Sequence, residues 1–144
     1  MLTHSPILRP VVVLVFWTLV MLIWLTVVRA PAMRKLGVDF TRQVGGVGSD
    51  LNGRVDPRAV WPAQNYTHLL EQPTLFYAVT HLLAIIGQSG TINTALAWAY
   101  VLLRIVHSIV QATINRVVVR FSLFLISTFC LAALTLHAAI AVFR

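Results

Sequence analysis

Four long apolar stretches dominate the pattern of hydrophobic and polar positions along the chain. They cover about residues 11–28, 65–87, 92–114 and 118–142. The first contains no charged residue, and at a rise of about 1.5 Å per residue each is long enough for one helix to cross a bilayer. The pattern therefore predicts an all-α fold, an integral membrane four-helix bundle that forms a single domain over residues 1–144.

Residues 30–63 form the only long polar segment, and we expect a cytoplasmic connector there. Its glycines and prolines are typical of loops and turns. The run VGGVGSD lacks the Gly-Lys-Ser/Thr ending of a phosphate-binding loop. A signal peptide is the competing interpretation of the first apolar stretch, because Ala30-Pro31-Ala32 resembles a cleavage site. The stretch is longer than the usual apolar core of a signal peptide, which favours a retained span.

Composition supports a membrane setting. Hydrophobic residues make up 58% of the chain and charged residues 10%, whereas a soluble domain is about half apolar and a quarter charged. A net charge of +7 would suggest nucleic acid in a soluble protein. Here the basic residues flank apolar stretches, so membrane topology and anionic lipid explain them. We expect the lipid bilayer as a partner and no nucleic acid.

The distribution of basic residues predicts the topology. The second connection has no Lys or Arg, and the third has Arg116 and Arg120. The first connection and its flanks contain Arg29, Arg34, Lys35, Arg42, Arg54 and Arg58. By the positive-inside rule, the first and third connections are cytoplasmic and both termini lie outside.

Two charged residues fall inside predicted spans. Glu71 lies about 12 Å from the cytoplasmic start of the second span, and Arg104 about 15 Å from the cytoplasmic end of the third. An unpaired charge in hydrocarbon is costly, and intramembrane charges usually have a partner. We predict that Glu71 and Arg104 pair or share a polar pocket.

Further polar residues extend this pattern. One face of the third span, at spacing i, i+4, i+7 and i+11, carries Tyr100, Arg104, His107 and Gln111. The second span has a looser stripe of Asn65, His68, Glu71 and Gln72. With Arg116 and Arg120 at its mouth, such a pocket suits a small anionic, amphipathic ligand. Arginine forms bidentate pairs with carboxylates, and a nearby guanidinium lowers the pKa of a bound thiol.

Two other interpretations stay open at this point. The Glu71–Arg104 pair could be only a structural ion pair, and Arg116 and Arg120 only topology anchors. A b-type haem protein is conceivable, because four histidines in the spans allow bis-histidine ligation; these are His68, His81, His107 and His137. Only one span carries two of them, which disfavours haem. No metal site is expected, because His68 and Glu71 give two ligands without a matching pair.

The motif NYTHLLEQPTLFYAV opens the second span, and LAWAYVLLRIVHSIVQATINRVVVRF runs across the third span and into the fourth. In these motifs the chain resembles the MAPEG family, the membrane-associated proteins in eicosanoid and glutathione metabolism. The likeness covers roughly residues 58–130, and it favours a bacterial-type branch of the family and hence a bacterial inner membrane.

The resemblance implies a homotrimer that binds glutathione between neighbouring subunits and acts on a small lipophilic substrate. Asn65 and Glu71 would hold polar groups of the peptide, and Arg58 could meet a carboxylate. Arg104 would match a family arginine of the glutathione site, followed by His107 and Gln111. Arg116 and Arg120 would match the basic pair of which one lies near the thiol in catalytic members.

Two departures bear on activity. Catalytic members have a tyrosine where this chain has Gln111, and a further tyrosine early in the fourth helix is replaced by Phe124. In addition, His68 occupies the position at which the eicosanoid enzymes have glutamate. The expected function is a glutathione transferase or peroxidase acting on lipophilic electrophiles. The alternative is a non-enzymatic membrane scaffold or ligand binder with the same fold.

Overall fold

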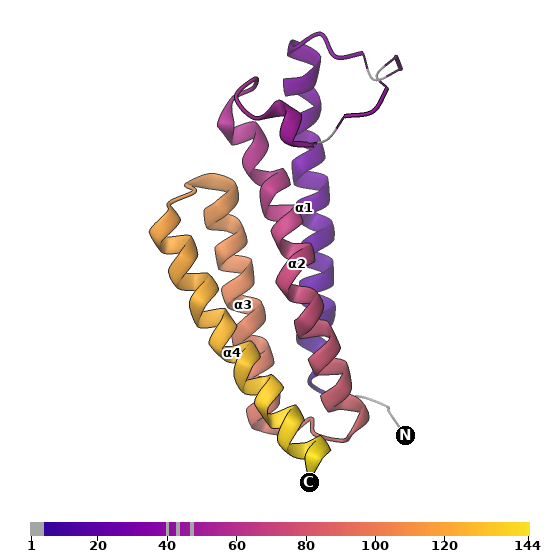
Figure 1. Ribbon diagram of the computed structural model, residues 1–144, viewed down its shortest axis with the longest axis vertical. Helices are drawn as coiled ribbons and strands as arrows, with labels where there is room; N and C mark the ends of the chain where they lie inside the picture. Colours follow the sequence, from indigo (N-terminus) through magenta and orange to yellow (C-terminus); the bar gives the residue numbers. More distant parts are fainter. Residues whose placement is uncertain (1–4, 40, 43, 47) are drawn as a thin grey trace.

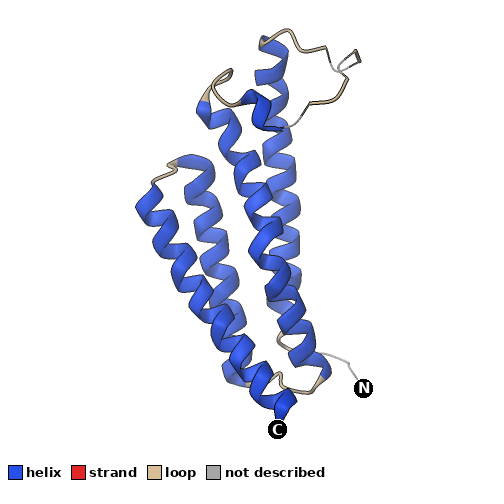
Figure 2. Cartoon of the chain, viewed as in Figure 1, coloured by secondary structure: helices blue, strands red, loops and turns tan. Residues whose placement is uncertain are grey.

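The computed structural model describes residues 5–39, 41, 42, 44–46 and 48–144, and its regular structure is helical (Figures 1 and 2). The four long helices are α1 (Leu8–Lys35), α2 (Pro57–Ile85), α3 (Thr91–Thr113) and α4 (Val117–Phe143). A short 3₁₀ helix, η1 (Gly48–Leu51), lies in the long connection. The described residues contain no strand. The predicted all-α four-helix bundle is confirmed.

Three of the helices, α1, α3 and α4, are long and apolar enough to cross a membrane. Within the described residues, α2 is not among them although it has 29 residues. Its polar side chains lower its hydropathy, including Asn65, His68, Glu71 and Gln72. Because α2 packs against α1, α3 and α4, its polar positions can face protein rather than lipid.

Helix α2 begins at Pro57, two turns before the predicted start of the second span at Asn65. The side chain of Asp56 caps it by accepting a hydrogen bond from the backbone N–H of Arg58, at 2.8 Å. Asp at the N-cap and Pro at the first helical position are a strong start signal that hydropathy alone does not report. Asn65 therefore lies inside the helix.

Consecutive helices run antiparallel, with α1 beside α2 and α3 beside α4 (Figure 1). The start of α1, the end of α4 and the α2–α3 turn lie at one end of the bundle. The long connection and the α3–α4 turn lie at the other end, which we call the loop end (Figure 1). The first and third connections thus share a side, as the topology requires; which side faces the cytoplasm stays a prediction.

Aromatic stacking and polar contacts join the helices. The rings of Phe76 on α2 and Tyr100 on α3 are fully buried and stack with centroids 4.4 Å apart. The side chain of Gln72 donates a hydrogen bond to the Thr128 hydroxyl on α4 at 2.8 Å. Nδ1 of His137 on α4 lies 2.6 Å from the side-chain oxygen of Asn93 on α3, so it forms a contact between these two helices.

Candidate functional site

The site is built around Arg104 on α3, the largest fully buried side chain, which is 1% exposed. Its Nη2 donates a hydrogen bond to the backbone carbonyl oxygen of His68 on α2, at 2.9 Å. Its Nε and Nη1 have no hydrogen-bond partner within the described residues. Arg104 therefore presents a buried positive charge with two guanidinium nitrogens that have no partner among the described residues.

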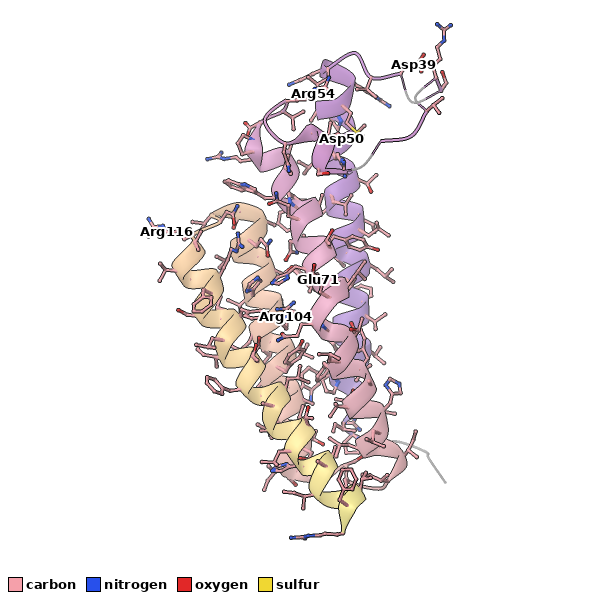
Figure 3. All side chains as sticks on the ribbon, viewed as in Figure 1. Asp39, Asp50, Arg54, Glu71, Arg104 and Arg116 are labelled. Carbon is pink, nitrogen blue, oxygen red and sulfur yellow. The ribbon has the colours of Figure 1, made fainter. Side chains whose placement is uncertain are left out.

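The predicted direct pair between Glu71 and Arg104 is not formed in the described part of the chain. Glu71 lies 2.9 Å from Nδ1 of His68, one turn away on the same helix, and its side chain is 61% exposed. Figure 3 places Glu71 and Arg104 at neighbouring levels of the bundle. His68 contacts both residues, through its ring and through its backbone oxygen, so the two charges share a polar neighbour instead of pairing.

His107 and Gln111 are buried on the same face of α3 as Arg104. Nδ1 of His107 lies 3.0 Å from the backbone oxygen of Arg120, and its Nε2 lies 3.0 Å from the side-chain amide of Gln111. The backbone carbonyl of Arg120 accepts a hydrogen bond from Nδ1, and the Gln111 atom beside Nε2 is its side-chain oxygen Oε1. Both ring nitrogens of His107 are therefore engaged.

The contacts of His107 count against its use as a haem ligand, because both of its ring nitrogens are engaged. Nδ1 of His81 lies 2.7 Å from the Tyr77 carbonyl oxygen of its own helix. The rings of His68 and His107 lie next to each other, with centroids 5.3 Å apart. No group of three or more His, Cys, Asp and Glu side chains gathers in the described ranges.

Arg120 and Arg116 differ in placement although both follow the α3–α4 turn. Arg120 is half-buried, and its Nη1 donates to the side-chain oxygen of Asn115, while its Nε has no partner among the described residues. Arg116 is exposed, and Figure 3 shows it directed away from the bundle. The structure thus brings Arg120 to the site and leaves Arg116 outside it.

A small cavity of about 170 Å³ adjoins these groups. It is lined by His68, His107, Val117, Arg120, Phe121 and Phe124. The ring of Phe124 stacks on His68, with centroids 5.5 Å apart, and the guanidinium carbon of Arg104 lies 5.8 Å from its centroid. The cavity therefore combines aromatic walls with the edge of one guanidinium.

Asn65 joins the site from α2, whereas Arg58 does not. Asn65 is 1% exposed and donates a hydrogen bond from Nδ2 to the Ser108 hydroxyl on α3, one turn beyond Arg104. Its Oδ1 has no partner in the described part of the chain. Arg58 is exposed near the loop end, about 10 Å along α2 from Asn65. Its predicted role stays a prediction.

Sequence reasoning missed Ser108 and Asn115. Ser108 lies four residues after Arg104, so the same helical spacing that identified Arg104 and His107 includes it. Asn115 has a φ of 55°, a left-handed conformation that Asn tolerates better than most residues. Its place in a two-helix turn was visible in the sequence, but its bond to Arg120 was not.

Comparison with known proteins gives a match to a protein family. The model of the MAPEG family matches residues 7–140, most of the chain. No curated protein and no solved structure matches the chain.

Proposed function

Because the chain belongs to the MAPEG family, we propose that it binds glutathione beside Arg104 and joins it, through its sulfur, to lipophilic electrophiles. The observation that carries the proposal is the buried guanidinium of Arg104, with Nε and Nη1 unpartnered among the described residues. An unpaired buried charge costs several kcal/mol, roughly. An anionic ligand would remove that cost, and glutathione has two carboxylates.

The neighbouring groups suit the rest of the peptide. Oδ1 of Asn65, which has no partner among the described residues, can accept an N–H, and the exposed Glu71 carboxylate complements an ammonium group. Arg120, with an unpartnered Nε, is the cation we assign to the thiol. A cation beside a thiol favours the thiolate, which is the nucleophile.

The proposed step is a substitution. The thiol proton passes to solvent, and the thiolate sulfur forms a bond to the electrophilic carbon. The bond to the leaving group breaks, and the leaving group takes the electron pair. The aromatic walls of the cavity, Phe121 and Phe124, suit an apolar substrate that enters from lipid.

Calorimetry with the detergent-purified protein and glutathione at neutral pH tests the binding. Arg104→Gln should weaken binding by about tenfold or more, because a hydrogen bond to a charged group is worth roughly 1.5–3 kcal/mol. Arg34→Gln, an exposed residue at the loop end, is the matched control and should bind normally. Unchanged binding by Arg104→Gln would refute the proposed site.

A non-enzymatic ligand binder is the second candidate, and Gln111 favours it. This residue stands where catalytic relatives have tyrosine, is 4% exposed and is bonded to His107. An amide lacks the phenol hydroxyl of that tyrosine, and this one is already bonded within the chain. Conjugation of glutathione to chlorodinitrobenzene by the purified protein, above the uncatalysed rate and lost in Arg120→Gln, would exclude this candidate.

The resemblance extends the proposal to assembly and location. We place the chain as a homotrimer in a bacterial inner membrane, with the long connection and the α3–α4 turn in the cytoplasm. Mass measurement in lipid nanodiscs tests the trimer. Labelling of single cysteines introduced at Arg42 and Gln88, in a Cys130→Ala background, tests which loop faces the cytoplasm.

A further inference from the structure

A groove at the loop end lies between the end of α1 and the start of α2. We call it the basic groove, because three cations line it: Lys35 at the end of α1, Arg54 in the connection and Arg58 in the first turn of α2. Its volume is about 450 Å³. Its apolar lining is formed by Val28, Pro31, Ala32, Leu36, Val55 and Ala59.

The charges in the basic groove are not balanced. Asp56 is the acidic residue that lines it, and its carboxylate is occupied in capping α2. Within the described ranges, no ion pair involves Lys35, Arg54 or Arg58. Three cations therefore face one carboxylate, which gives the groove the charge complementarity for an anion.

The apolar lining indicates that the anion carries hydrocarbon. Along α1, the lining continues into side chains that face outward, with Val27 66% and Ile23 64% exposed. These residues belong to a helix long and apolar enough to cross a membrane. Figure 3 shows Arg54 at the loop end of the bundle. A molecule with an anionic head and apolar chains matches both parts.

We propose that the basic groove binds an anionic phospholipid. The phosphodiester headgroup contacts Lys35, Arg54 and Arg58, and the acyl chains lie along α1 past Val27 and Ile23. Basic pockets beside membrane helices recognise anionic headgroups in this way. The groove shares no lining residue with the cavity beside His107, so this site is separate from the glutathione site.

Native mass spectrometry of the full chain, in micelles with equimolar phosphatidylglycerol and phosphatidylcholine, tests the proposal. The wild type should retain phosphatidylglycerol preferentially. Lys35→Gln/Arg54→Gln should weaken that retention about twenty-five-fold, because each basic residue near an anionic lipid contributes roughly a factor of five. Gel filtration and far-ultraviolet circular dichroism would establish that the variant folds.

The matched control is Arg34→Gln/Arg42→Gln, which removes the same charge at the same end but outside the groove lining. It should retain phosphatidylglycerol like the wild type. Equal losses in both double variants would mean diffuse attraction to the membrane surface and overturn the proposal. Displacement of the lipid by soluble glycerol phosphate would indicate a site for free phosphate esters and overturn it as well.

Discussion

Arg104 donates a hydrogen bond from Nη2 to the backbone carbonyl oxygen of His68, 2.9 Å away on the neighbouring helix. The ring of His68 in turn lies 2.9 Å from a carboxylate oxygen of Glu71. His68 thus separates the buried cation from the exposed carboxylate. The arrangement leaves Arg104 without an acidic partner among the described residues and makes the need for a counter-charge the main electrostatic feature of the site.

Replacing Arg104 with methionine should separate stability from binding. Replacing a buried ion pair with apolar groups is often neutral, or stabilises the protein by about 1–4 kcal/mol. The same is expected when a buried charge without a counter-charge is removed. We therefore expect the thermal midpoint in detergent to stay or rise in Arg104→Met, while glutathione binding is lost in calorimetry. A large drop in the thermal midpoint would mean that the bond to His68 holds the fold, and would weaken the binding interpretation.

Glu71 should matter for binding and little for stability. Its contact with His68 is an exposed pair, and such pairs contribute about 0–1 kcal/mol. Glu71→Gln should leave the thermal midpoint nearly unchanged and weaken glutathione binding by several-fold through loss of the carboxylate. Asp56→Asn, which removes an exposed carboxylate at the loop end, serves as the charge-matched control for binding. Glutathione affinity that is equal in the wild type and Glu71→Gln would remove Glu71 from the site.

Helical periodicity predicted the buried face of α3 correctly. Tyr100, Arg104, His107 and Gln111 share it and are all buried. Periodicity did not predict the orientation of α2, because that depends on its packing against three other helices. The buried face of α2 carries Leu69, Phe76 and Leu83 at seven-residue spacing. Asn65, four residues before Leu69, lies on the same face and is also buried.

Glu71 lies off that buried face, which is why it shares His68 as a polar neighbour with Arg104 and forms no direct pair with it. Matching the depths of two charges on adjacent helices places them at one level but not face to face. The same limit applies to Arg116 and Arg120, which are one turn apart in sequence. Arg120 is held inward by its bond to Asn115, whereas Arg116 is exposed. The geometry of the α3–α4 turn determines which arginine side chain is directed toward the site, and sequence spacing alone does not predict it.

The contact between His137 and Asn93 should contribute measurably to stability. Asn93 is 8% exposed, so His137→Leu would leave its side-chain oxygen buried without this partner. An unsatisfied buried polar group costs about 1–3 kcal/mol. His81→Leu is the matched control, because His81 is exposed and bonds within its own helix. Chemical denaturation in detergent should show a clear loss only for His137→Leu; equal values for the two variants would contradict the structure.

The turn at Asp39 should titrate abnormally. The hydroxyl of Thr41 at 2.6 Å and its backbone N–H at 2.9 Å donate to Asp39 and hold the pKa of that carboxyl below its usual 3.8. Because its pKa is lowered, the ionised Asp39 carboxylate stabilises the turn fully at pH values above the ordinary carboxyl pKa. This stabilisation is lost as the pH falls through the lowered pKa. Nuclear magnetic resonance titration should show the pKa rising toward normal in Thr41→Ala; no change would exclude the hydroxyl as its main cause.

Asn115 offers the sharpest test of how Arg120 is positioned. Its left-handed φ of 55° suits glycine, so Asn115→Gly should keep the turn while removing the oxygen that accepts from Arg120. The thermal midpoint should change little. If Arg120 stabilises a bound thiolate, the apparent pKa of glutathione on the protein, followed by thiolate absorbance, should rise in Asn115→Gly. Asn115→Asp keeps an acceptor for Arg120 and should hold its guanidinium in place. A thiol pKa that is the same in the wild type, Asn115→Gly and Arg120→Gln would show that Arg120 does not act on the thiol.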